Sequence, residues 1–238
     1  YDVLKDAFRP SHADYTYQAK YGIRDHRGGG RASARETVAR VVAGCIAKQL
    51  LEKYGITIMA YTSQIGSVCV DRKWEQLDLS TRDSNPFYCP DVDKAREMKI
   101  LLETVADNGD TVGGIVTCVL KNCPVGLGEP IFDKLQADLA KAMLSISSVK
   151  GFDYGDGFGA ASMLGSDSLD LFDSRFATRT NLSGGVQGGI SNGEDIVFRV
   201  AFKPIASLAK PIAIVDKNGN EKIVQLGGRH DCCQVPRA

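Results

Sequence analysis

The order of helical and strand-like segments is the feature that most constrains the fold of this chain. Segments with apolar residues at helical spacing are mixed with short runs rich in β-branched residues, without regular strand–helix–strand alternation. A doubly wound parallel sheet requires that alternation, because each parallel crossover usually contains a helix. The pattern therefore favours an α+β fold.

Three helices are expected. Ser33 and Glu36 fit a capping box at the start of the first, and Gly55 follows its end. Its apolar residues are Val38, Val41, Val42, Cys45, Ile46 and Leu50. We expect these helices over residues 34–53, over residues 91–107, and from Pro130 through Met143.

Short β-rich runs predict strands over residues 56–61, 114–120, 196–203, 211–216 and 222–226. The last two flank Asn218-Gly219, a pair typical of a tight hairpin turn. We therefore expect an antiparallel hairpin near the end of the chain.

Charge and cysteine content narrow the class of protein. The 238 residues carry 29 Lys and Arg against 29 Asp and Glu, so no net field attracts nucleic acid or an anionic membrane. The cysteine count of seven is odd and no pair has C-x-x-C spacing, which indicates free thiols in a reducing compartment. No apolar run approaches the length of a membrane span. Because the chain has no net charge, any recognition of an anion must come from a local cluster of residues.

One local cluster suits an anion. The sequence Gly28-Gly29-Gly30 directly precedes the first predicted helix, where backbone amides lack helical partners and the helix dipole favours negative charge. No Gly-Lys-Ser/Thr follows, so this is not a Walker A loop. A flexible glycine loop beside a solvated basic face is the alternative. The surrounding arginines are Arg9, Arg24, Arg27, Arg31, Arg35 and Arg40.

Three other segments are candidates with open alternatives. His12 can exchange protons near neutral pH, and Asp14 or an arginine could tune it, although a lone histidine is more often structural. Residues 180–193, with five glycines, could wrap a ring or a phosphate, or form a plain β-turn. Residues 227–231 join a cation, an imidazole and a carboxylate, in either a catalytic loop or a surface turn. Residues 155–160 match G-x-G-x-x-A but lack the helix that a Rossmann site needs.

Five ordered motifs together resemble the chorismate synthase family. They cover essentially the whole chain. They are Arg-Pro-Ser-His-Ala-Asp-Tyr-Thr-Tyr (9–17), Gly-Gly-Gly-Arg-Ala-Ser-Ala-Arg-Glu-Thr (28–37), Gly-Leu-Gly-Glu-Pro-Ile-Phe-Asp-Lys-Leu (126–135), Gly-Gly-Ile-Ser-Asn-Gly (188–193) and Gly-Arg-His-Asp (228–231).

The resemblance implies a sandwich of helices and antiparallel β-sheets, assembled as a homotetramer. It implies a lyase of the shikimate pathway of aromatic amino acid biosynthesis. Such an enzyme uses reduced FMN to convert 5-enolpyruvylshikimate 3-phosphate to chorismate and phosphate by 1,4-elimination. A cytoplasmic enzyme is expected, with a plastid as the alternative. A non-catalytic flavin- or phosphate-binding fragment, or a degenerate homologue, is the alternative function.

The resemblance also implies roles for individual residues. His12 matches a histidine beside the flavin, and Asp231 matches a carboxylate near the flavin N5 that assists proton removal. Arg9 and Arg35 match residues that bind substrate anions. No metal is expected. The flavin positions match Arg31, Ala32, Ser33, Ser147, Ser148, Gly188, Lys203, Pro204, Ile205, Ala206, Ser207 and Arg229.

The chain departs from the family pattern at several points. We expect a single domain over residues 1–238 that lacks the family's N-terminal segment, with its Gly-Glu-Ser-His-Gly motif, and a C-terminal helical segment. Residues 203–207 read Lys-Pro-Ile-Ala-Ser where Lys-Pro-Thr-Ser-Ser is usual, so two hydroxyls are absent. Leu182 stands where Asn, His or Arg is usual, and Cys232 replaces proline.

Overall fold

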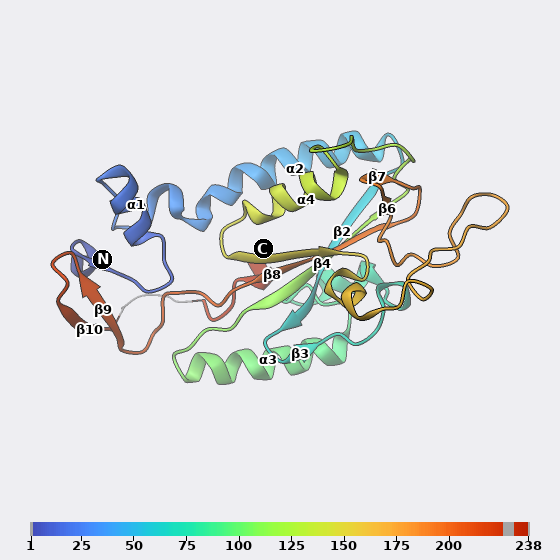
Figure 1. Ribbon diagram of the computed structural model, residues 1–238. Helices are drawn as coiled ribbons and strands as arrows, with labels where there is room; N and C mark the ends of the chain where they lie inside the picture. The colour runs from blue at the N-terminus through green and yellow to red at the C-terminus, as the bar shows by residue number, and fades with distance from the viewer. Residues whose placement is uncertain (1, 226–230, 238) are drawn as a thin grey trace.

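The structure is a computed structural model that describes residues 2–225 and 231–237 (Figure 1). The α-helices are α1 (Asp14–Tyr21), α2 (Thr37–Glu52), α3 (Val92–Asp107) and α4 (Leu135–Leu144). The strands are β1 (Ala7–Phe8), β2 (Thr57–Ile65), β3 (Val68–Cys69), β4 (Gly114–Lys121), β5 (Val149–Tyr154), β6 (Val186–Gln187), β7 (Ile190–Ser191), β8 (Ile196–Phe202), β9 (Ile212–Asp216) and β10 (Glu221–Val224). The 3-10 helices are η1 (Asp2–Leu4), η2 (Gly30–Ala32), η3 (Ala34–Glu36), η4 (Trp74–Gln76), η5 (Leu79–Ser84), η6 (Gly157–Ser162) and η7 (Val235–Arg237).

A five-stranded antiparallel sheet forms the centre of the molecule. Its strand order is β3-β2-β4-β8-β5, and every neighbouring pair is antiparallel. In Figure 1, α2 and α4 lie on one side of this sheet and α3 lies on the other. Helices packed on antiparallel sheets confirm the α+β class. Because the sheet is antiparallel and residues 155–160 lead into η6, these residues do not form a Rossmann turn.

The main core packs against this central sheet and includes side chains from helices on both of its sides. Phe198 and Val200 of β8 are buried there, and Phe198 packs on Phe152 of β5 with ring centroids 5.4 Å apart. Met98 of α3 belongs to the same cluster and is fully buried. Each such side chain contributes roughly 1.5–3 kcal/mol by leaving water. This packing fixes the frame from which the site loops extend.

Helix α2 differs from what its apolar spacing suggests. None of its described residues is buried, and its predicted stripe is exposed. The exposed fractions are 64% for Val38 and Val41, 57% for Val42, 66% for Ile46 and 55% for Leu50. Near the end of the helix, Leu51 is partly buried against the main core. Helical spacing identifies an apolar face, but it does not say which element covers that face.

A smaller sheet joins the two ends of the chain. Its order is β1-β9-β10, with Ala7 paired to Asp216. The hairpin predicted around Asn218-Gly219 is confirmed, since β9 and β10 are antiparallel neighbours. The Asp216 carboxylate accepts hydrogen bonds from the backbone amides of Asn218 and Asn220 and so closes the turn. This sheet brings the residues that follow β1 next to the segment between β8 and β9.

Two helix starts require correction. The first helix begins at Thr37 rather than at residue 34, because residues 34–36 form the tighter turn η3. The third begins at Leu135 rather than at Pro130, and the side chain of Ile131 is 71% exposed. The Leu135 amide donates to the Gly189 carbonyl, so the preceding residues form a loop against the β6–β7 hairpin. The second helix is confirmed, with Asp91 as its N-cap.

No helix in the described part of the chain is both long enough and apolar enough to cross a membrane. The cysteines are free thiols, as predicted from their odd count and spacing.

Candidate functional site

Arg9, His12 and Asp14 form a compact cluster between β1 and α1, in which Arg9 and Asp14 are buried and His12 is partly exposed. Nε and Nη2 of Arg9 donate to the two Asp14 carboxylate oxygens at 2.8 and 3.1 Å. His12 Nδ1 lies 3.0 Å from Asp14 Oδ1 and 3.1 Å from Arg9 Nη2. Asp14 is 3% exposed and Arg9 is 8% exposed, so water competes little for these contacts. The local sequence thus holds an imidazole against a paired cation and anion.

Arg24 adds a second cation to this cluster. Its Nη1 lies 3.3 Å from Asp14 Oδ1, and its Nη2 donates to backbone carbonyls of the N-terminal segment, including that of Ala7 at 2.8 Å. Burial alone would raise the pKa of Asp14. The hydrogen bonds from His12 and Arg9 outweigh that effect and hold the pKa of this carboxyl well below its usual range. Asp14 is therefore a carboxylate at neutral pH.

The segment after β8 meets this cluster from the other end of the chain. Arg9 Nη1 donates to Ser207 Oγ at 3.1 Å, and Lys203 Nζ donates to the Ser11 carbonyl at 2.5 Å. The Lys203 backbone amide donates to the Ser148 carbonyl at 2.9 Å. Burial, with a smaller contribution from the nearby Lys150, lowers the pKa of Lys203. Predicted residues from three distant stretches of sequence therefore lie together.

Residues 111–113 contact the predicted positions Pro204 and Ile205, and also the chain next to Asp231. Thr111 Oγ1 donates to the Ile205 carbonyl at 2.8 Å. The Val112 amide donates to the Cys232 carbonyl at 2.8 Å, so the chain directly after Asp231 runs beside Val112. Pro204 packs over Gly113, where an added Cβ would lie 3.3 Å from its Cδ. Arg229 lies outside the described residues.

The glycine loop ends in short turns rather than in the first turn of α2. Gly29 and Gly30 adopt positive φ angles of 83° and 48°, which glycine reaches without strain. Ser33 Oγ accepts from the Arg35 amide at 3.3 Å, so Ser33 caps η3. The predicted capping box is only half present. The Glu36 carboxylate pairs with Arg31 at 2.7 Å instead of reaching back to the Ser33 amide.

One contact relates the start of α2 to the other segments. Arg40 Nη2 donates to the Ser145 carbonyl at 3.1 Å, shortly before Ser147 and Ser148. The start of α2 therefore contacts residues 145–148, which lead into β5. The Ser148 carbonyl in this segment accepts the hydrogen bond from the Lys203 amide. Arg31 is 84% exposed, so its guanidinium is open to solvent.

Gly188 is the predicted residue that the structure separates from this group. It lies in the β6–β7 hairpin with a φ of 63°, and an added Cβ would meet nothing within 4 Å. Figure 1 shows β6 and β7 at the opposite end of the main sheet from α1. The hairpin contacts the start of α4. Residues 186–191 form a short hairpin, and Thr180, Asn181 and Leu182 of the same glycine-rich stretch line the cleft described next.

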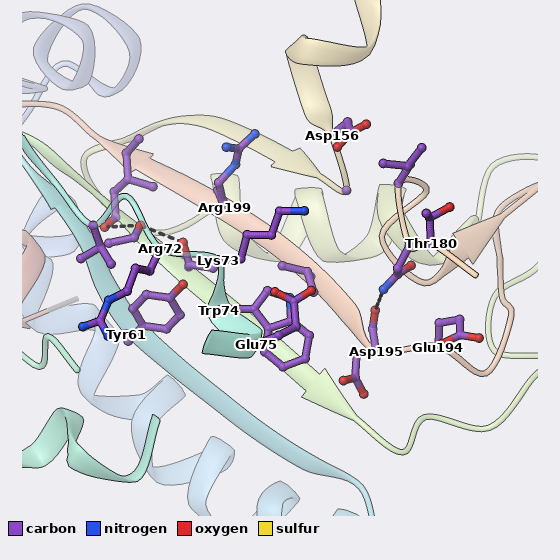
Figure 2. Close-up of a pocket in the computed structure, with 18 of the residues that line it drawn as sticks. Tyr61, Arg72, Lys73, Trp74, Glu75, Asp156, Thr180, Glu194, Asp195 and Arg199 are labelled. Carbon is purple, nitrogen blue, oxygen red and sulfur yellow. Dashed lines mark hydrogen bonds between the residues drawn. The ribbon is translucent and has the colours of Figure 1, made fainter. Parts of the chain in front are cut away.

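A cleft of about 830 Å³ lies elsewhere in the molecule, over the sheet face shared by Tyr61, Thr117 and Arg199. Figure 2 shows Trp74 on one side of this cleft and Asp195 on the other. Asp153 holds the Arg199 guanidinium through contacts of 2.8 and 2.6 Å. Burial raises the pKa of Asp195. None of the described residues assigned to the site lines this cleft, but Thr180, Asn181 and Leu182 of the glycine-rich stretch 180–193 do.

The chain is similar to known proteins in its family model, in its sequence and in its fold. A family model described as chorismate synthase matches residues 1–238. A chorismate synthase from Christiangramia forsetii is 55% identical over all of this chain, which covers 67% of that protein. One from Bacteroides thetaiotaomicron is 54% identical, again over the whole chain and 67% of the relative. The chain spans about two thirds of the length of these curated relatives.

A solved structure agrees with the sequence matches. The crystal structure of a chorismate synthase superimposes with a TM-score of 0.74 at 34% identity, over 80% of this chain and 62% of that one. This level of identity and overlap supports a shared fold as well as shared ancestry. Matched along its whole length by the family model and more than half identical to the relatives above, this chain belongs to the chorismate synthase family.

Proposed function

We propose that the protein containing this chain is a lyase that converts 5-enolpyruvylshikimate 3-phosphate to chorismate and phosphate, with reduced FMN as cofactor. Family membership over residues 1–238 supports the reaction. The observation that carries the site is the contact of Arg9 with Ser207 and of Ser11, which precedes His12, with Lys203, because each pair is almost two hundred residues apart in sequence. A fold-stabilising contact alone does not require this combination of cations, imidazole and hydroxyl.

The donor set suits two phosphorylated ligands. Ser207 Oγ accepts a hydrogen bond from Arg9, which leaves its own O–H free to donate to an anion. Lys203 adds an ammonium group at the Ser11 carbonyl, and an arginine fork pairs well with phosphate or carboxylate. When bound, reduced flavin supplies electron density to the elimination as phosphate leaves, while the protein supplies placement and electrostatics.

The remaining assignments follow the family positions. His12 transfers a proton beside the flavin, and Asp231 assists removal of the ring proton. Arg9 and Arg35 bind substrate anions. The flavin is held by Arg31, Ala32, Ser33, Ser147, Ser148, Gly188, residues 203–207 and Arg229. Because Gly188 is distant from the cluster within one chain, it would reach the same flavin only through another copy in an assembly.

The replacement of two hydroxyls in residues 203–207 leaves Ser207 as the hydroxyl donor of that segment. Ile205 instead offers its carbonyl to Thr111. We therefore propose weaker flavin affinity than a Lys-Pro-Thr-Ser-Ser segment would give, with the same elimination chemistry. A homotetramer, a single domain over residues 1–238 and a cytoplasmic location are further proposals, which rest on the family resemblance.

The test is anaerobic turnover by the complete protein supplied with reduced FMN and 5-enolpyruvylshikimate 3-phosphate. Release of phosphate and chorismate in equal amounts is expected. Replacing His12 or Asp231 by Ala should lower kcat by about 10²–10⁴-fold, the usual contribution of general acid–base groups. The urea midpoint of the Asp231 variant should change little. Tight FMN binding without elimination would replace the lyase with a flavin-binding role.

A further inference from the structure

Asp14 is a buried carboxylate that the proposed mechanism does not use. Its two oxygens receive the backbone amide and guanidinium of Arg9, the Nη1 of Arg24 and a contact from His12. Only 3% of its surface is exposed. A carboxylate surrounded in this way fixes the orientation of every group that contacts it, because each alternative orientation would leave a buried charge unpaired.

The geometry at Asp14 bears on which nitrogen of His12 carries the proton. Asp14 Oδ1, Arg9 Nη2 and His12 Nδ1 form a triangle with sides of 3.0, 3.1 and 3.1 Å. A carboxylate only accepts hydrogen bonds, and a guanidinium only donates them. Arg9 Nη2 already donates to Oδ1. The second hydrogen of Nη2 can reach an unprotonated Nδ1, but its lone pair would then also face a carboxylate oxygen 3.0 Å away, the shorter of the two contacts. A protonated Nδ1 instead donates to that charged oxygen, and this favours the Nδ1-protonated form.

We propose that Asp14 is a positioning residue: it holds His12 in the Nδ1-protonated tautomer, so that Nε2 is the nitrogen that exchanges protons at the site. This inference rests on the proposed function, since it assigns the tautomer of the histidine that the lyase uses. Through the same carboxylate, Asp14 holds the Arg9 guanidinium with its Nη1 directed at Ser207. One buried side chain thus aligns a proton-transfer group and an anion-binding group.

The tautomer can be measured without any activity. Only His12, His26 and His230 contribute imidazole nitrogens, so ¹⁵N-histidine labelling and long-range ¹H–¹⁵N correlation spectra give three ring patterns, with His12 assigned from the His12→Gln variant. At a pH where the ring is neutral, His12 is expected to show a protonated Nδ1 and a bare Nε2. In Asp14→Asn the amide cannot serve all the donors that the carboxylate serves, and the pattern should shift toward protonated Nε2.

Asp91→Asn is the matched control. Asp91 is also a buried carboxylate, 8% exposed, paired with an arginine at 2.8 Å, but it caps α3 and does not contact His12. The His12 pattern should not change in this variant. A protonated Nε2 in the unmodified chain, or an unaltered pattern in Asp14→Asn, would overturn the proposal. The isosteric amide is chosen so that the fold survives, and Asp14→Ala provides a second, independent variant.

A double-mutant cycle tests the role in turnover. In the complete protein, Asp14→Asn should lower kcat by about 10²-fold or more, because losing the carboxylate that sets a catalytic histidine's tautomer has cost as much as about 10⁴-fold elsewhere. In a His12→Gln background the same change should lower kcat by less than about threefold, because its effect on proton transfer runs through His12, while its effect on anion binding through Arg9 appears in KM. Losses that multiply would indicate a merely structural role. If the unmodified protein forms no chorismate, the lyase proposal fails, whatever the tautomer.

Discussion

Met98 and Val41 provide a direct test of which helix belongs to the core. Both occupy apolar positions at helical spacing, in α3 and α2 respectively. Met98 is fully buried, whereas Val41 is 64% exposed. We expect Met98→Ala to destabilise this chain by about 2–5 kcal/mol, since it loses transfer free energy and leaves a cavity. Val41→Ala should be nearly neutral.

The value for Val41 follows from its exposure. The substitution removes two carbon groups worth about 0.8 kcal/mol each when fully buried. With 64% of the residue already in water, roughly a third of that sum, about 0.6 kcal/mol, is lost. Alanine has the better helix propensity by a similar amount, which offsets the loss. The net change in the free energy of unfolding is therefore about zero.

The assay is urea unfolding of the 238-residue chain, followed by circular dichroism, with the slope of unfolding free energy against urea compared between variants. Equal slopes show that the midpoints report stability. A loss above about 1.5 kcal/mol for Val41→Ala would refute the reasoning, because no exposed valine costs that much. Repeating the measurement at several protein concentrations shows whether a second copy covers α2, since only an associating chain has a concentration-dependent midpoint.

Three further predictions follow from individual side chains. Because the pKa of Asp14 is lowered in the fold, its stabilisation is complete above the unfolded pKa of about 4 and is lost as the pH falls below that value; the urea midpoint of Asp14→Asn should therefore lie below that of the unmodified chain at pH 7, with a smaller gap at pH 3. Burial raises the pKa of the Cys118 thiol to about 12, so iodoacetamide should modify the exposed Cys45 and leave Cys118 unmodified until the chain unfolds, as mass spectrometry would show. Ser207→Ala removes one hydrogen-bond donor from the proposed flavin site and should raise the Kd for reduced FMN about tenfold by calorimetry; an unchanged Kd would remove Ser207 from that site.

The fold class and several elements could be predicted from local patterns. The spacing of Met98 and Leu102, together with the Asp91 cap, is a local property of α3, and the Asn218-Gly219 turn is a local property of its hairpin. The start of α4 could not be predicted in this way. Residues 130–134 form a loop because Gly189, more than fifty residues away, accepts the Leu135 amide. Short-range propensity contains no information about such a partner.

The residues of the candidate site could likewise be named from the sequence, but their contacts could not. The family motifs identified Arg9, His12, Lys203 and Ser207 as residues of interest, and the sequence already showed Asp14 beside His12. The contact between Arg9 and Ser207 depends on β1 pairing with β9, a long-range event with no local signature. The cleft around Trp74 and Arg199 was not predicted as a site, although Thr180, Asn181 and Leu182 of the glycine-rich stretch line it, because the rest of its lining comes from scattered strands and loops.

What the sequence by itself determined was the family, the α+β class and the identity of the polar residues. Side-chain chemistry and short-range periodicity depend only on residues that are close together in the sequence. Only the tertiary structure decided which of those residues meet. Strand pairing between distant segments placed Ser207 on Arg9 and left Gly188 at the far end of the sheet. Contacts of this kind depend on the global path of the chain, which a one-dimensional pattern does not contain.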